Sequence, residues 1–259
     1  MKKKLWILLG IILIGAGIVV GGIGLKEYLD EKNAGDDYKD LKEDVVVPSV
    51  SPVPKEEQDP SETKELLDIP VDFAKLTEKC SDIYAWIRIP GTDIDYPIVQ
   101  REGDNAYYLN HTIEGKKKIE GAIFTEDYNT RDFTDPHTVI YGHNMKNGSM
   151  FRQLHRYEDR KFFQENDEIL IYQPEQILHY QIFAAYVYDD RHLLMSFDCE
   201  NPDEYAAYLD SIFRQKNMNT MIDTSVTVTE EDKIVTLSTC NGNDDERYLV
   251  QAVLVSIES

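Results

Sequence analysis

Residues 234–240 read Ile-Val-Thr-Leu-Ser-Thr-Cys, and the run Asn241-Gly242-Asn243-Asp244-Asp245 follows directly. Apolar and β-branched residues of this kind are typical of a buried strand, and the Asn/Gly/Asp run has strong turn chemistry. A second apolar run then extends from Arg247 to Ile257. Because the connection between Cys240 and Arg247 is short, we expect the two runs to pair as neighbouring strands, with the cysteine at the exposed end.

Six further runs upstream have the same strand-forming character. They occupy residues 85–89, 94–99, 121–125, 137–141, 168–172 and 179–188, and the first two flank the turn-forming Pro90-Gly91-Thr92-Asp93. Eight short candidate strands with polar connections favour a mainly β domain, either a barrel or a sandwich.

Two stretches of this domain read as helices instead. Phe73, Leu76 and Cys80 are apolar at three- and four-residue spacing, which predicts a helix before the first strand. Residues 203–216 place Tyr, Ala, Leu, Ile and Phe at helical spacing, which predicts an amphipathic helix between the sixth and seventh strands.

The N-terminus has the pattern of a membrane anchor. Residues 5–24 are uncharged and rich in Leu, Ile, Val and Gly, and three lysines precede them. Twenty residues of helix span about 30 Å, the thickness of the bilayer's hydrocarbon core. The positive-inside rule then places residues 1–4 in the cytoplasm and the rest outside the cell. A cleaved signal peptide is the alternative, but its apolar core is usually shorter.

Residues 25–69 are acidic and contain a Pro-rich stretch. Residues 25–68 carry 14 acids against 6 lysines, and Val47-Pro48-Ser49-Val50-Ser51-Pro52-Val53-Pro54 lies in the middle. This composition predicts an extended, mobile stalk, although the sequence allows short helices near residues 38–44 or 61–67. We therefore expect a folded domain over residues 70–259.

The overall composition excludes several classes of protein. The 259 residues are 42% hydrophobic and 29% charged, which fits neither a wholly disordered chain nor a multi-pass membrane protein. A net charge of −21 disfavours nucleic acid as a partner. Three well-separated cysteines without a Cys-x-x-Cys motif indicate neither a disulfide framework nor a zinc site.

Three residues have settings that suit catalysis. Cys240 closes a strand beside a polar loop and could be a nucleophile, or a small apolar residue buried at a strand end. His143 follows a buried strand and Gly142, where an imidazole can transfer protons, or be an ordinary turn residue. Arg247 could stabilise an oxyanion, or balance the three acids that precede it. The remaining histidines have no comparable setting.

Together these residues resemble the sortase family, and the match is best to its class B branch. The blocks Tyr141-Gly142-His143-Asn144-Met145 and Thr236-Leu237-Ser238-Thr239-Cys240, with Arg247 after them, look like the signature blocks of that branch. Residues 86–87, 96–100 and 105–109 also resemble its earlier blocks. The resemblance runs from about Phe73 to the C-terminus, and the helix at 203–216 matches the class B insertion.

The resemblance implies an eight-stranded sortase-type β-barrel and a membrane-anchored extracellular cysteine transpeptidase of Gram-positive bacteria. By this analogy Cys240 attacks the threonine carbonyl of an LPxTG-like or NPxTx-like sorting signal and forms a thioacyl intermediate. His143 protonates the departing amine and deprotonates the incoming one, while Arg247 holds the substrate backbone and the oxyanion. The residues implied to contact the signal are Asn105, Leu109, Tyr141, Ser238 and Thr239.

The implied partners are surface proteins that carry a C-terminal sorting signal and an amine of the peptidoglycan precursor, lipid II. A pilin lysine is the alternative amine, for a sortase that polymerises pili. No acidic cluster has the spacing of a calcium site, and no metal or cofactor is expected. We expect Cys80 and Cys199 to be structural or free, and Cys240 to be reduced.

Two interpretations from other classes compete. A cysteine peptidase or hydrolase of the papain-like type usually places its nucleophile early, at a helix N-terminus and before the histidine, whereas here His143 precedes Cys240. A non-catalytic surface binding module would tolerate replacement of Cys240.

Overall fold

The computed structural model describes residues 25–26, 28–46, 67–217, 219–243 and 245–259. Residues 1–4, which are predicted to be cytoplasmic, the predicted membrane segment 5–24, the whole Pro-rich stretch 47–54 and nearly all of the possible helix at 61–67 lie outside these ranges. Among the residues that are described, none of the helices combines the length and the apolar character needed to cross a bilayer.

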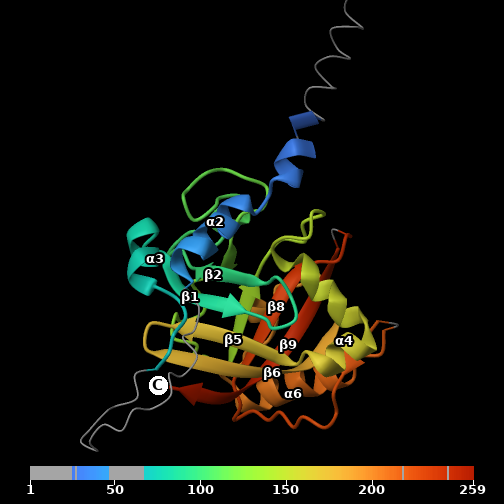
Figure 1. Ribbon diagram of the computed structural model, residues 1–259. Helices are drawn as coiled ribbons and strands as arrows, with labels where there is room; N and C mark the ends of the chain where they lie inside the picture. The colour runs from blue at the N-terminus through green and yellow to red at the C-terminus, as the bar shows by residue number, and fades with distance from the viewer. Residues whose placement is uncertain (1–24, 27, 47–66, 218, 244) are drawn as a thin grey trace, which may run out of the picture.

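The core of the molecule is a closed barrel of eight strands (Figure 1). They are β1 (Ile83–Arg88), β2 (Asp95–Val99), β3 (Ile123–Thr125), β4 (His137–Tyr141), β5 (Glu168–Gln173), β6 (Gln176–Asp189), β8 (Ile234–Cys240) and β9 (Glu246–Glu258). The strand order is β5-β1-β2-β3-β4-β8-β9-β6, and β5 pairs with β6 to close the ring. All eight predicted strands are present, and of the two architectures that the strand pattern allowed, the barrel is the one observed.

Two pairings in the barrel are parallel, β2 with β3 and β4 with β8, and the others are antiparallel. The parallel pair β4–β8 brings the C-terminal ends of both strands to the same edge of the sheet. Because β9 is antiparallel to β8, it begins at that edge. This topology gathers the residues that follow β4, end β8 and open β9.

Helices and a short strand complete the domain. They are α2 (Asp36–Val45), α3 (Phe73–Lys79), the 3-10 helices η1 (Tyr107–Leu109) and η2 (Phe151–Glu158), α4 (Arg160–Glu165), α5 (Leu193–Ser196), α6 (Pro202–Phe213) and β7 (Met221–Ile222). The two helices predicted within the domain correspond to α3 and α6. β7, which pairs with β6 outside the ring, and the helices η1, η2, α4 and α5 were not expected.

The apolar core has two parts, one inside the barrel and one beneath α6. Trp86, with no exposed surface, lies in the first cluster together with residues of α2 and α3. Tyr205, Tyr208 and Ile212 of α6 belong to the second, against β6, β8 and β9. Figure 1 shows α6 against β6, on a different side of the molecule from α2 and α3.

Residues 36–46 are not an extended stalk, and the short helix that the sequence allowed near residues 38–44 is present. Residues 36–45 form α2, and the side chains of Tyr38, Leu41 and Val45 are buried in the barrel's core cluster. The Tyr38 hydroxyl donates a hydrogen bond to the Gly121 carbonyl at 2.7 Å. These three residues are spaced i, i+3 and i+7, so they form one apolar face on a helix that is otherwise acidic. The packed unit therefore begins well before Pro70.

Candidate active site

Cys240 and Arg247 face each other across the β8–β9 pair. They are register partners at the end of the ladder, where Cys240 is the last residue of β8. The Cys240 side chain is exposed, so it is not the buried strand-end residue that the sequence left open. The Arg247 guanidinium donates to the Glu246 backbone carbonyl at 2.9 Å. The register therefore places the two side chains on the same face of the sheet, at the open edge of the barrel.

His143 reaches the same edge from β4. Tyr141 pairs with Ser238 in the parallel β4–β8 ladder, and the Gly142 amide donates to the Ser238 carbonyl at 3.1 Å. Each chain then advances two residues, which places His143 level with Cys240. Within the described part of the chain, the imidazole Nε2 hydrogen-bonds the Leu109 carbonyl at 2.6 Å rather than the thiol.

The glycine before His143 is required by packing. A Cβ atom at Gly142 would lie 2.5 Å from the Ile123 Cδ1 and 2.7 Å from the Phe151 ring, closer than real contacts allow. Its φ angle is not among the positive ones, so the backbone conformation does not require glycine here. Gly142 therefore allows close packing of the β4 end against β3 and η2.

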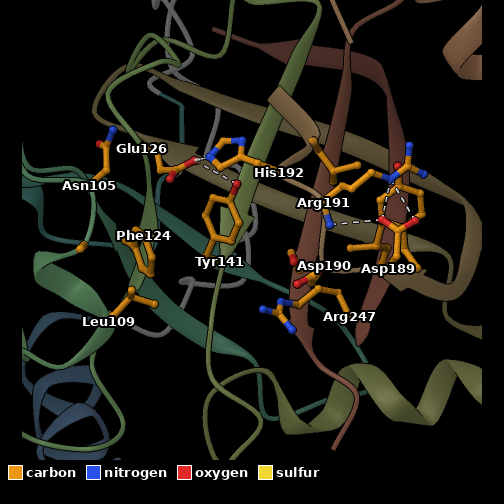
Figure 2. A pocket seen from close by; sticks show the side chains of 15 residues that line it. Asn105, Leu109, Phe124, Glu126, Tyr141, Asp189, Asp190, Arg191, His192 and Arg247 are labelled. Atoms are coloured by element: carbon orange, nitrogen blue, oxygen red, sulfur yellow. Dashed lines mark hydrogen bonds and ion pairs between the residues drawn. The ribbon is translucent and has the colours of Figure 1, made fainter. Parts of the chain in front are cut away.

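A pocket of about 310 Å³ adjoins this edge (Figure 2). Four of the five predicted signal-binding residues line it, together with Arg247; the four are Asn105, Leu109, Tyr141 and Ser238. Thr239 does not, because successive residues of a strand point to opposite faces; its side chain is buried. Cys240 is two residues beyond Ser238 and so points to the face of β8 that Ser238 presents to the pocket.

Within the pocket, Asn105 is already engaged by the protein. Its amide nitrogen donates to the Asp127 carboxylate at 2.7 Å, and its amide oxygen accepts from the Asp127 backbone N–H at 2.8 Å. The Gly103 N–H, and after it the Asn105 amide nitrogen, donate to the Asp127 carboxylate and hold its pKa below the usual range. Asn105 thus shapes the loop at the pocket rim, in addition to lining it.

The pocket contains an ionisable cluster that the sequence did not indicate. The Glu126 carboxylate accepts from the Tyr141 hydroxyl at 3.0 Å and pairs with His192 Nε2 at 2.8 Å (Figure 2). Burial, reinforced by the neighbouring Glu126 charge, raises the pKa of Tyr141, so its phenol remains a neutral donor. The cluster holds the Tyr141 ring at the pocket wall.

The cysteines differ sharply in setting. All three lie in the described part of the chain and none forms a disulfide. Burial, helped by nearby acids, raises the pKa of Cys199 to about 12, so that thiol stays protonated and unreactive. Cys80 is partly buried with its Sγ 3.6 Å from the Tyr108 hydroxyl. Cys240 is the exposed thiol, and it lies beside a histidine and an arginine.

A second histidine lies on the opposite side of Cys240. His155, on η2, places Nε2 3.2 Å from the Cys240 carbonyl oxygen, which also accepts from the Asn144 side chain at 2.7 Å. No local pattern in the sequence marks His155, because its contact with Cys240 arises only from the way η2 folds over the end of β8.

Comparisons with known proteins point to one family. The sortase domain family model matches residues 87–255. A curated sortase B of Listeria monocytogenes is 35% identical over 188 residues, which are 71% of this chain and 73% of the relative. The Staphylococcus aureus sortase B–substrate complex matches with a TM-score of 0.63 at 29% identity, over 71% of this chain and 84% of that one. A solved sortase B complexed with triglycine gives a TM-score of 0.64 at 29% identity, over 71% and 85% of the two chains.

Proposed function

The chain belongs to the sortase family as a class B cysteine transpeptidase, and from that premise we propose that it cuts a C-terminal sorting signal after threonine and joins the protein to an amine. The signal is LPxTG-like or NPxTx-like. The acceptor is the amine of the peptidoglycan precursor, lipid II. The observation that carries this proposal is the exposed Cys240 thiol opposite Arg247, at the edge where β4 delivers His143.

We assign Cys240 as the nucleophile. Its thiolate attacks the threonine carbonyl carbon, and the oxygen takes the negative charge beside the Arg247 guanidinium. Collapse of this intermediate breaks the bond to the next residue's nitrogen, which leaves as an amine after taking a proton from His143. The thioacyl bond to Cys240 divides one amide exchange into two easier steps.

The second half of the reaction reverses the roles. The incoming amine attacks the thioacyl carbon and gives its proton to His143, and the Cys240 thiolate departs. His143 needs freedom to approach both nitrogens, and its present partner, the Leu109 carbonyl, belongs to a residue that also lines the pocket. A signal bound in the pocket thus contacts the residue that holds the imidazole.

The substrate class follows from the pocket and the relatives. A pocket of about 310 Å³ beside Cys240 suits a short extended peptide rather than a large folded surface. A solved S. aureus sortase B holds a substrate, and another sortase B holds triglycine, a peptide with a free amine. These complexes support a signal-bearing protein and an amine as the two partners here.

We further propose that residues 5–24 anchor the protein in the cell membrane, with residues 1–4 in the cytoplasm and the catalytic domain outside. The apolar run and the three preceding lysines support this orientation. Protease added to intact protoplasts is then expected to degrade the catalytic domain while a cytoplasmic marker survives. Protection of the domain until the membrane is broken would contradict the orientation.

The activity is tested with the full-length protein in mild detergent. Fluorogenic LPxTG-, NPxTx- and SPxTG-type peptides are incubated with and without triglycine, and products are identified by mass. Wild type should yield a threonine–triglycine product, and Cys240→Ala none. Cys199→Ala is the matched control, since Cys199 lies outside the site, and it should retain activity.

Other products would point to other functions. Cysteine-dependent hydrolysis without any ligated product would indicate a peptidase. Ligation to a pilin lysine peptide in preference to triglycine would indicate a pilin-polymerising sortase. Full activity in Cys240→Ala would remove the proposed mechanism.

A further inference from the structure

The backbone carbonyl of Cys240 is held by two side chains from outside its sheet. Asn144 Nδ2 donates to this oxygen at 2.7 Å, and His155 Nε2 lies 3.2 Å from it. A strand-end carbonyl could instead be satisfied by water, because Cys240 is exposed. Two protein groups converge on the residue that carries the reactive thiol.

Both of these groups belong to one closed unit that also contains His143. The Phe151 N–H donates to the His143 carbonyl at 2.9 Å, and Asn144 forms an isolated β-bridge with Met150. η2 begins at Phe151 and carries His155. The unit of residues 143–158 therefore fixes the His143 backbone internally, and its contact with the Cys240 carbonyl fixes that backbone relative to the thiol.

The partner of His155 determines which ring nitrogen carries hydrogen. His155 Nδ1 lies 2.7 Å from the Glu158 carboxylate, which can only accept, so Nδ1 holds a hydrogen. In the neutral ring Nε2 is then an acceptor, and it can accept from Asn144 Nδ2 at 3.1 Å. In the protonated ring Nε2 also carries hydrogen, and it can donate to the Cys240 carbonyl.

Three further residues contact His155, Glu158 or Asn144. The Tyr248 ring of β9 stacks on His155 with centroids 4.8 Å apart, and burial, then the Glu158 charge, raise the pKa of Tyr248, so it stays neutral. Asn219 Nδ2 donates to the second Glu158 oxygen at 3.3 Å. Arg152 donates to Asn144 Oδ1 at 3.1 Å and orients that amide.

We propose that His155 is a positioning residue: with Asn144 it fixes the Cys240 backbone relative to His143, either by accepting from the Asn144 amide that binds the Cys240 carbonyl or by donating to that carbonyl itself. The inference rests on the proposed role of Cys240 as the nucleophile. Since His155 does not touch the reacting atoms, it acts on the alignment of the thiol. Alignment affects turnover more than it affects binding of the signal.

The test compares the steady-state kinetics of His155→Phe with those of wild type. Phenylalanine preserves the stack on Tyr248 and removes both nitrogens. We expect kcat to fall about tenfold with KM nearly unchanged, the effect of one hydrogen bond. His179→Phe is the matched control, because His179 also pairs with carboxylates but lies near the start of β6.

A second variant tests the orientation of the ring independently. In Glu158→Ala the His155 Nδ1 loses its carboxylate partner, so the ring is no longer held toward Asn144 and the Cys240 carbonyl. We expect kcat to fall, by less than in His155→Phe, with KM nearly unchanged. Melting temperatures show whether either variant is unfolded.

Several outcomes would overturn the inference. They are a kcat of His155→Phe within twofold of wild type, an effect on KM alone, or a kcat of Glu158→Ala equal to that of wild type. Cys240→Ala separates this failure from failure of the proposed function. An inactive Cys240→Ala beside a fully active His155→Phe rejects the positioning role alone, whereas an active Cys240→Ala rejects the nucleophile assignment itself.

Discussion

Arg247 has two roles, a hydrogen bond to the backbone and donation to the oxyanion, and a lysine could not fill both equally well. It is the register partner of Cys240, it lines the pocket, and its guanidinium donates to the Glu246 carbonyl at 2.9 Å. The planar guanidinium can keep such a backbone contact while other N–H groups face a developing oxyanion. A lysine retains the positive charge but offers one nitrogen.

Arg247→Lys is therefore expected to lower kcat by about 10²-fold, the effect of losing one oxyanion donor. Steady-state kinetics with the best peptide measure this directly. Arg214→Lys, in an exposed ion pair with Asp210 on α6, is the control and should be unaffected. A kcat within threefold of wild type for Arg247→Lys would show that charge alone is enough.

Glu126 is the common partner of two residues that line the pocket. It binds both the Tyr141 hydroxyl and His192, so Glu126→Ala leaves two donors without their partner. We expect KM for the peptide to rise about tenfold with a smaller change in kcat, since the loss is of binding geometry rather than of reacting groups. Glu126→Gln keeps an acceptor oxygen, so its KM should lie between those of wild type and Glu126→Ala. Glu165→Ala on α4 is the control, and an equal KM for all variants would contradict the role.

At the scale of single residues, the sequence predicted those whose positions are set by neighbouring strands. Cys240 and Arg247 are adjacent because a short loop joins β8 to β9, and the connection is visible in the chain. His155 and His192 could not be found in this way. Each meets its partner, Cys240 or Glu126, through tertiary packing between segments far apart in sequence.

At the scale of elements, strands were easier to predict than the shorter helices. The barrel strands have continuous apolar runs, and β1, β2 and β4 lie within a few residues of their predicted bounds. η2 was missed because its buried residues, Phe151, Leu154 and Tyr157, are three apart. That spacing fits a 3-10 helix rather than the 3.6-residue period of an α-helix.

The acidic helix α2 is the element whose packing the composition concealed. Tyr38 is 2% exposed, donates to the Gly121 carbonyl at 2.7 Å and meets the Tyr96 ring edge-on at 5.7 Å between centroids. Tyr38→Ala should lower the free energy of unfolding by about 3 kcal/mol, as for other large-to-small changes in a core. Tyr28→Ala, at a side chain that is mostly exposed, is the control.

Urea unfolding of both variants measures this difference. If α2 were a loosely attached stalk, both substitutions would change stability by less than about 0.5 kcal/mol, as is usual for surface sites. Equal stabilities would therefore contradict the packing of α2 on the barrel. The same reasoning requires that shortened forms of the protein keep residues 25–46.

At the scale of the whole molecule, the joint between α6 and the barrel is where pH should act on stability. His137 on β4 is buried, its Nε2 lies 2.7 Å from the Thr236 hydroxyl of β8, and its ring stacks on Tyr208 of α6 at 5.2 Å. Burial lowers the pKa of His137 to about 3, because the charged ring would have no water around it. No pattern in the sequence singles out this histidine, since its environment is assembled by three separate elements.

Between the ordinary imidazole pKa of about 6.5 and the native value, the unfolded chain binds one proton more than the folded chain. The free energy of unfolding therefore falls as pH drops through this range, by about 1.4 kcal/mol per pH unit from this residue. Denaturant titrations at pH 7.0, 6.0, 5.0 and 4.0 should show this slope, and His137→Gln should lose it while keeping the shallower dependence due to carboxylates in both proteins. Glutamine can lower the free energy of unfolding at every pH, but the slope due to His137 is still given by how the difference between the two curves changes with pH. Parallel curves for wild type and His137→Gln from pH 6 to pH 4 would show that His137 accepts its proton in the folded state, and that the α6 joint admits water.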